Sequence, residues 1–199
     1  MIKIAMIRHG KTYGNTLGRY IGVTDEPLCE EGKKELEQRT MDTVELLFVS
    51  PLKRCLETAD ILYPYAKQVK IPEFAECNFG EFENKNYQEL SQSKAYQAWI
   101  DSGGTLAFPN GESRENFCKR TIGGFESALA QALELRRAVS DKEIQIVFFV
   151  HGGTIMAIMS HYCDMDYYDY QVKNGCGYSC EVAVDGDEIV FNEIQPISL

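Results

Sequence analysis

The stretch IKIAMIRHGKTYGN, residues 2–15, decides the fold class of this chain. Residues 2–7 hold five apolar side chains and one lysine, a run typical of a buried β-strand. The run leads directly into Arg8, His9 and Gly10, which places a cation and an imidazole at the carboxyl end of the strand. In an open α/β sheet, ligands bind outside the carboxyl ends of the strands. The stretch therefore predicts a strand that delivers reactive groups to a binding site.

Further apolar runs predict strands, and they alternate with helical patterns. Strands are expected at 45–50, 68–74 and 143–150, the last being the most apolar. Helices are expected at 30–42, 51–63, 113–139 and 153–162, with short helical pieces around 86–100. A hairpin is expected at 178–194, turning at Asp185-Gly186. This order predicts an α/β fold: a mostly parallel sheet with helices on both faces and an antiparallel edge hairpin.

The composition is that of one globular domain. The chain has 199 residues, 44% of them hydrophobic and 25% charged, which is enough for one core. No stretch approaches the roughly 18 apolar residues that a membrane helix needs. The segment 75–112 differs from the rest because it is rich in Phe, Tyr, Asn and Gly. We expect a single domain, 1–199, with this segment inserted as a small helical lid.

The net charge of −10 restricts the partners of the chain. A field of that sign repels nucleic acid and anionic membranes, so neither is expected as a partner. A small anionic substrate would need a local basic pocket. The seven cysteines are an odd, scattered set without a C-x-x-C pair, which indicates reduced thiols in a cytoplasmic protein. The oligomeric state stays open between a monomer and a homodimer.

Polar groups stand at or shortly after the carboxyl ends of the predicted strands. They are Arg8, His9, Ser50, Arg54, Glu76, His151 and Gly152. Because the ends of parallel strands meet at one edge of a sheet, most of these groups are expected to converge. Arginine forks bind phosphate, a neutral imidazole can attack phosphorus, and a second, protonated histidine can bond phosphoryl oxygens. A glutamic acid can protonate the leaving oxygen, so the set predicts phosphoryl transfer through a phosphohistidine.

Four motifs in this order resemble the histidine phosphatase superfamily, which includes the cofactor-dependent phosphoglycerate mutases. They are RHGKTYGN (8–15), SPLKRCLETA (50–59), AECNFGEFE (75–83) and VHGG (150–153). The resemblance covers nearly the whole chain and implies a phosphoglycerate mutase-like fold. It also implies a phosphomonoester substrate, with no metal and no organic cofactor.

The resemblance implies two groups of site residues. The catalytic group is His9, Glu76, Arg8, Arg54 and His151. The substrate-binding group is Asn15, Gly10, Thr16 and Gly152. In this pattern His9 accepts the phosphoryl group, Arg8, Arg54 and His151 cradle it, and Glu76 is the proton donor. We expect Nδ1 of His9 to contact a backbone carbonyl, which leaves Nε2 to attack.

Within the superfamily, three stretches look most like α-ribazole phosphatases of cobamide synthesis. They are residues 18–32, 78–101 and 109–113. Lys11 departs from the pattern, since a glutamate is usual there, and adds positive charge at the mouth of the site. The segment 75–112 has two lysines and many aromatics, which suits a nucleoside-like ring better than a second anion. The aromatics Phe79, Phe82, Tyr87, Tyr96, Trp99 and Phe108 are expected to pack the lid, and one or two to contact the substrate.

Several alternatives stay open or are set aside. A broad-specificity phosphatase of small metabolites, a phosphoglycerate mutase and a non-enzymatic phospho-ligand binding module remain. The sequence AMIRHGKT, 5–12, formally fits a relaxed nucleotide phosphate-binding loop, but its first half is the strand itself and it has one glycine. A cysteine phosphatase is excluded because no cysteine has the C-x5-R spacing.

Overall fold

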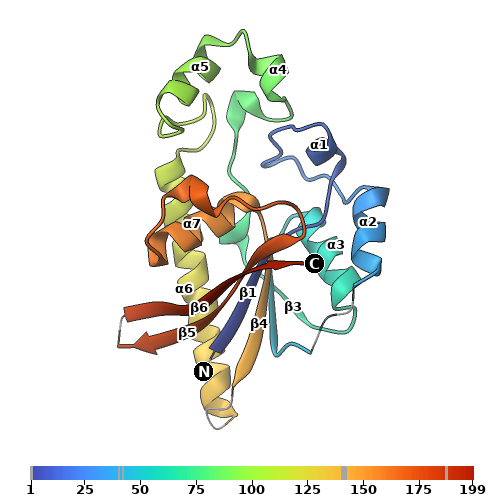
Figure 1. Cartoon of the computed structure of the whole chain (residues 1–199), viewed down its shortest axis with the longest axis vertical. Coiled ribbons are helices and arrows are strands. Elements are labelled where there is room, and N and C mark those ends of the chain that lie inside the picture. The colour runs from blue at the N-terminus through green and yellow to red at the C-terminus, as the bar shows by residue number, and fades with distance from the viewer. Residues whose placement is uncertain (1, 40, 42, 140–142, 187) are drawn as a thin grey trace.

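The computed structural model describes residues 2–39, 41, 43–139, 143–186 and 188–199, and it contains one six-stranded sheet in the order β3-β2-β4-β1-β5-β6 (Figure 1). The strands are β1 Ile2–Arg8, β2 Leu46–Val49, β3 Gln68–Lys70, β4 Ile144–Val150, β5 Cys176–Asp185 and β6 Glu188–Ser198. The first four strands pair in parallel, whereas β5 and β6 form an antiparallel edge. The predicted α/β fold is confirmed.

The helices connect the strands in the predicted alternation. The α-helices are α1 Tyr13–Thr16, α2 Glu30–Glu37, α3 Lys53–Leu62, α4 Tyr87–Leu90, α5 Lys94–Asp101, α6 Arg114–Ala138 and α7 Gly152–Tyr162. The 3-10 helices are η1 Pro72–Phe74, η2 Gly80–Phe82 and η3 Tyr167–Tyr170. Among the described residues, no helix is both long and apolar enough to span a lipid bilayer.

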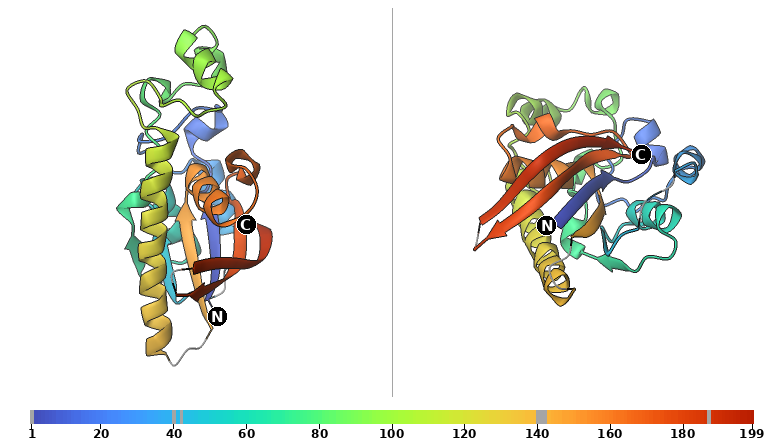
Figure 2. Two further views of the ribbon diagram at one scale, coloured as in Figure 1. Left: turned by 90° about the vertical axis from the view of Figure 1, so that its left-hand side faces the viewer. Right: turned by 60° about the horizontal axis from the view of Figure 1, so that its bottom comes forward.

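Helices cover both faces of the sheet (Figures 1 and 2). Successive side chains of a strand point to opposite faces, so Phe148 and Phe149 of β4 enter different cores. Phe148 packs with Phe125 of α6, while Phe149 belongs to the core that includes Leu36 of α2. A central strand buried on both faces needs apolar residues throughout, which explains the sequence of β4.

The segment 75–112 stands at one end of the molecule, where Figure 1 draws α4 and α5 above the sheet. It has an apolar cluster of its own, which includes Phe82, Leu90 and Phe108 and reaches Phe117 of α6 and Ala157 of α7. The aromatic rings in this cluster meet mostly edge to face. The lid is therefore packed onto the same two helices that cover one face of the sheet.

Three predicted boundaries differ from the structure. The helix expected at 30–42 ends at Glu37, although residues 40 and 42 lie outside the described residues. The strand expected at 68–74 ends at Lys70, because Pro72 cannot donate a ladder hydrogen bond and instead begins η1. The hairpin is longer than 178–194, since its strands pair from Cys176 to Ser198.

Candidate active site

The two histidines lie together because β1 and β4 are parallel neighbours. Arg8 pairs in register with Val150, and the amide of His9 donates to the Val150 carbonyl at 3.0 Å. One residue farther along each strand, the ring centroids of His9 and His151 are 5.2 Å apart. The sheet register thus produces the convergence that the sequence predicted.

His9 has the geometry of a neutral nucleophile. Its Nδ1 lies 2.7 Å from the carbonyl oxygen of Gly10, and because a carbonyl only accepts, Nδ1 carries the proton. Nε2 therefore keeps its lone pair, and the predicted backbone contact is confirmed. The imidazole is buried, and this burial, together with the charges of Arg54 and Arg8, holds the pKa of His9 well below its ordinary value.

His151 lies behind His9 at the N-terminal end of α7 and is fully buried. The Nε atom of Arg54 donates to its Nδ1 at 3.3 Å, so the ring proton is on Nε2, which donates to Ser50 Oγ at 2.7 Å. Burial and then the charge of Arg54 lower the pKa of His151 well below the ordinary value. The expectation of a protonated second histidine is therefore wrong for this geometry; a phosphoryl dianion beside the ring would raise the pKa.

Arg54 is the most deeply buried charge of the site, with no exposed surface. Arg54 lies in the first turn of α3. Its guanidinium donates to the carbonyls of Ile21, Gly22 and Thr24 as well as to His151. Arg54 thus anchors the loop after α1 to the ends of the strands.

Arg8 faces the pocket more openly. Its Nη1 donates to the carbonyl of Val172 at 2.8 Å, but its buried Nε has no hydrogen-bond partner among the described residues. A buried donor without an acceptor is costly, and an anion would satisfy it. The Cβ position of Gly152 lies 3.7 Å from the Arg8 side chain, which is ordinary van der Waals contact, so Gly152 borders this donor closely.

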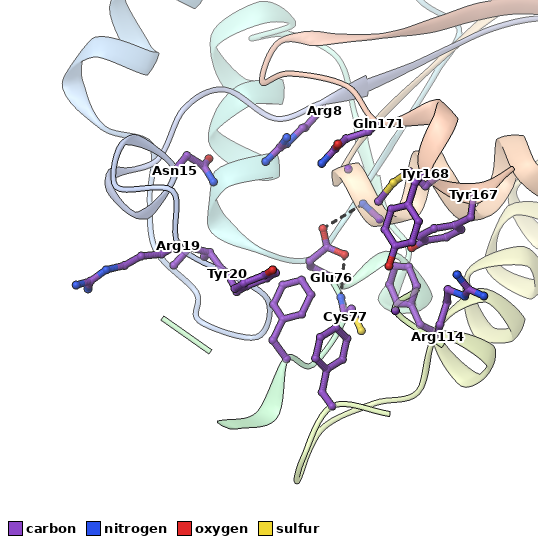
Figure 3. A pocket seen from close by; sticks show the side chains of 18 of the residues that line it. Arg8, Asn15, Arg19, Tyr20, Glu76, Cys77, Arg114, Tyr167, Tyr168 and Gln171 are labelled. Atoms are coloured by element: carbon purple, nitrogen blue, oxygen red, sulfur yellow. Dashed lines mark hydrogen bonds between the residues drawn. The ribbon is translucent and has the colours of Figure 1, made fainter. Parts of the chain in front are cut away.

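Glu76 follows η1 in the chain, and its buried carboxyl lies against the N-terminal end of α7. Its Oε1 accepts from the amide of Cys77 at 2.9 Å and its Oε2 from the amide of Gly153 at 3.3 Å, as the dashed lines in Figure 3 show. Burial raises the pKa of Glu76, against the opposing effect of these amides and of Arg54 and Arg8. A buried carboxyl with a raised pKa can hold a proton for transfer.

The neighbouring glutamates have other contacts. Glu83 accepts from the amides of Gly22 and Thr24 at 2.8 and 2.9 Å, and Glu81 accepts from Asn110 at 2.8 Å. Glu73 is exposed. Of these four glutamates, Glu76 is therefore the one that lines the pocket together with His9.

The pocket beside His9 has a volume of about 310 Å³. Aromatic side chains form much of its wall: Tyr20, Phe79, Trp99, Phe108, Phe117, Tyr167 and Tyr168. Three cations also line it: Arg8, Arg19 and Arg114. Figure 3 shows Glu76 between Tyr20 on one side and Tyr167 and Tyr168 on the other, with Arg8 above it. The pocket is therefore a cationic cradle continued by an aromatic chamber.

Three of the six aromatics predicted to pack the lid, Phe79, Trp99 and Phe108, also line this pocket. Phe82 and Tyr96 pack behind them, and Tyr87 is exposed. The sequence alone did not indicate a role in the pocket for Tyr20, Arg114, Tyr167 and Tyr168, nor a role for Ser50. Two signals were available: Ser50 stands at the end of a predicted strand, and Arg114 stands at the start of the helix predicted at 113–139.

The substrate-binding residues of the prediction lie in different surroundings. Asn15 and Gly152 line the pocket, and Asn15 Oδ1 accepts from Asn174 at 3.0 Å. The amide of Gly10 is taken by Thr58 Oγ1 at 3.0 Å. Thr16 is exposed, does not line the pocket, and donates its hydroxyl to the Tyr13 carbonyl at 2.7 Å.

Lys11 does not bring the unpaired positive charge expected at the mouth. Its Nζ lies 2.7 Å from Glu31 and 2.6 Å from Glu35, so two carboxylates of α2 neutralise it. Within the described ranges, no three His, Cys, Asp or Glu side chains are grouped as metal ligands would be. The donors that converge here are cations and amides, which suit an anion.

Comparisons with known proteins agree with this geometry. The family described as histidine phosphatase superfamily (branch 1) matches residues 4–194. The chain is 27% identical to the uncharacterized phosphatase PhoE of Bacillus subtilis, over 92% of this chain and 90% of that protein. It is 25% identical to the adenosylcobalamin/alpha-ribazole phosphatase of Salmonella typhimurium, over 91% of both.

A solved structure has the same fold. The putative alpha-ribazole-5'-P phosphatase of Escherichia coli superposes with a TM-score of 0.76 at 23% identity, covering 96% of this chain and 94% of that one. The family match spans nearly the whole chain and includes both histidines, both arginines of the cradle and Glu76. The chain belongs to the histidine phosphatase superfamily (branch 1) and is an enzyme that hydrolyses phosphomonoesters.

Proposed function

We propose that the chain hydrolyses its substrate by double displacement, with His9 as the phosphoryl acceptor. Nε2 of His9 attacks phosphorus while Arg8 bonds the phosphoryl oxygens, and His151 joins Arg8 by turning its Nε2–H from Ser50 Oγ towards the phosphoryl group. Arg54 supports the cradle through His151. The observation that carries this proposal is the Nδ1 contact of His9 with the Gly10 carbonyl, because it fixes the proton away from the attacking nitrogen.

Glu76 serves both half-reactions in this proposal. Its raised pKa favours the protonated form, which gives its proton to the leaving oxygen as the P–O bond breaks. The resulting carboxylate then takes a proton from water, and that water attacks the phosphohistidine and releases inorganic phosphate. The Cys77 and Gly153 amides stabilise the carboxylate between the two steps.

We propose α-ribazole 5′-phosphate as the substrate. The aromatic chamber next to His9 supports this choice, since planar rings bury well between aromatic side chains. A relative with 25% identity is named for that activity. The volume of the pocket also lies within the range of small-molecule sites.

Arg114 supports a second candidate, a small phosphate ester with another anionic group, such as 3-phosphoglycerate. The lid segment 75–112 has two lysines as its cations, but Arg19 and Arg114 reach the pocket from outside that segment. Arg19 is paired with Glu89 at 3.0 Å. Arg114 lies over the Tyr167 ring at 5.4 Å and has no ion-pair partner among the described residues.

The test is a comparison of kcat/KM for α-ribazole 5′-phosphate, 3-phosphoglycerate and p-nitrophenyl phosphate, with and without 2,3-bisphosphoglycerate. We expect kcat/KM to be higher for α-ribazole 5′-phosphate than for 3-phosphoglycerate, and inorganic phosphate to be released from all three substrates. Efficient interconversion of 3- and 2-phosphoglycerate with little phosphate release would make the chain a mutase. Binding without turnover of p-nitrophenyl phosphate would overturn the catalytic proposal.

A further inference from the structure

The backbone that carries Glu76 is held from behind by a single guanidinium. Arg120 of α6 donates from Nη1 to the carbonyls of Glu73 and Ala75, both at 2.7 Å. Its Nη2 donates to the carbonyl of Glu76 itself at 3.2 Å. Three carbonyls within four residues are therefore fixed to one rigid helix.

The remaining donors of Arg120 grip Glu112. Nε lies 2.8 Å from Oε1 and Nη2 lies 2.9 Å from Oε2, so both carboxylate oxygens are engaged in a fork. The Phe117 ring lies 4.8 Å from the guanidinium carbon and shields the pair. Burial would raise the pKa of Glu112, but the hydrogen bonds and charge of Arg120 keep it below the ordinary value. The pair is thus ionised at neutral pH.

Glu112 is the last residue of the lid segment, and Glu76 lies at its beginning. The two ends are joined, because the amide of Glu112 donates to the Asn78 carbonyl at 2.8 Å and Glu112 Oε2 accepts from the Asn78 amide at 3.4 Å. Gly111 passes so close that a Cβ there would lie 2.4 Å from the same carbonyl. Arg120 therefore ties both ends of the lid to α6, and Glu76 belongs to the first of these ends.

We propose that the Arg120–Glu112 pair is a positioning device that sets the carboxyl of Glu76 against the leaving oxygen and couples it to the lid. The inference rests on the role of Glu76 in the proposed function. Among the described residues, the Glu76 carboxyl accepts hydrogen bonds from two amides, so its place depends on the backbone that Arg120 fixes. A displacement of about 1 Å in a catalytic group can cost on the order of 100-fold in rate.

The experiment compares phenyl phosphate with p-nitrophenyl phosphate, which share a ring but differ in how much the leaving oxygen needs a proton. Arg120→Met removes the donors and keeps most of the apolar stem. We expect it to lower kcat for phenyl phosphate about 10-fold more than kcat for p-nitrophenyl phosphate. Lys119→Met, one residue earlier and exposed, makes the same charge change and should leave both values unaltered.

A double variant separates positioning from general damage. If Arg120 acts through Glu76, adding Arg120→Met to Glu76→Gln should not increase the difference between the two substrates. Equal losses on both substrates in Arg120→Met would overturn the proposal and leave Arg120 a structural residue. If that variant does not fold, Glu112→Gln carries the same comparison, since it keeps the shape of the side chain. A Glu112→Gln enzyme with unchanged selectivity would also overturn the proposal.

Failure of the proposed function has a different signature. If Glu76→Gln itself lowers kcat equally for both substrates, Glu76 is not the acid. In that case the proposed function is wrong, and the role of Arg120 is no longer in question. If Glu76→Gln is selective and Arg120→Met is not, only the positioning inference fails.

Discussion

The cradle around His9 and the wall of the aromatic chamber are built in different ways. The cradle residues follow strands of one sheet and are fixed by backbone register, as Arg8 opposite Val150 shows. The chamber combines the lid with Tyr20 from the loop after α1, whose backbone pairs with the lid at Asn84 and Lys85, and with Tyr167 from η3. Geometry fixed by a sheet suits chemistry that tolerates no displacement. A wall made of loops can change its shape and therefore its substrate.

Replacing the nucleophile should produce the largest effect on the cradle side. His9→Ala removes the covalent route, so turnover should fall by on the order of 10⁴-fold or more. Acid-quenched wild-type enzyme should carry an acid-labile, base-stable phosphoryl group, and the variant none. Thr16→Ala is the control, because Thr16 is exposed and outside the pocket. A phosphoryl group on a cysteine or serine would contradict the mechanism.

Arg54→Lys tests whether the buried cradle tolerates a small change of geometry. An ammonium cannot serve three carbonyls and His151 together, so donors and acceptors would be left unpaired inside the protein. We expect turnover to fall by on the order of 100-fold, with a lower Tm. Lys53→Arg, on the exposed side of the same turn, should change neither. Near-normal turnover in Arg54→Lys would mean that its fork has no part in the cradle.

Glu76 lies where the cradle and the chamber meet, and the pH dependence of the Glu76→Gln variant tests its role as the acid. The first step needs neutral His9, whose pKa is lowered, and protonated Glu76, whose pKa is raised. The rate with phenyl phosphate should therefore rise with pH below the usual histidine range and decline as pH passes the raised pKa of Glu76. The glutamine variant should lose that decline and lose roughly 10 times more activity on phenyl phosphate than on p-nitrophenyl phosphate. An unaltered profile would move the acid role to another residue.

Substitutions in the chamber wall should have the smallest effects, and they should change KM rather than kcat. Trp99→Ala removes an aromatic ring from the wall. It should raise KM for α-ribazole 5′-phosphate about 10-fold and leave KM for 3-phosphoglycerate unchanged. Arg114→Gln should do the reverse if a second anion reaches it. Steady-state kinetics on both substrates decide between these outcomes. A large loss of kcat with p-nitrophenyl phosphate in either variant would show that the wall and the cradle are not separable.

The sequence predicts the cradle well because its residues are adjacent to strands. Arg8, His9 and His151 stand at the ends of apolar runs, so the alternation of strands and helices is enough to bring them together. Their electrostatics are harder to predict, since the pKa of His151 depends on its burial and on Arg54, which is 97 residues away. The position of a group was therefore predictable, whereas its protonation was not.

The chamber wall escaped prediction for a physical reason. Arg114 of α6 lies over the ring of Tyr167 in η3, and the ring centroids of Tyr20 and Trp99 are 6.2 Å apart. No local sequence pattern around these residues indicates which partner each one contacts. Lys11 illustrates the same limit, because its neutralisation by Glu31 and Glu35 depends on how α2 docks. Such contacts arise from packing between loops, for which periodicity carries no information.

The strand order has a consequence for how the protein is made. Of the six strands in this sheet, β1 leaves the ribosome first, yet its two neighbours are β4 and β5, which are synthesised more than a hundred residues later. Until then an apolar strand waits without its partners, which exposes the nascent chain to aggregation and slows its folding. Catalytic competence must therefore appear late in synthesis, when His151 and the Val172 carbonyl reach the strand that was made first.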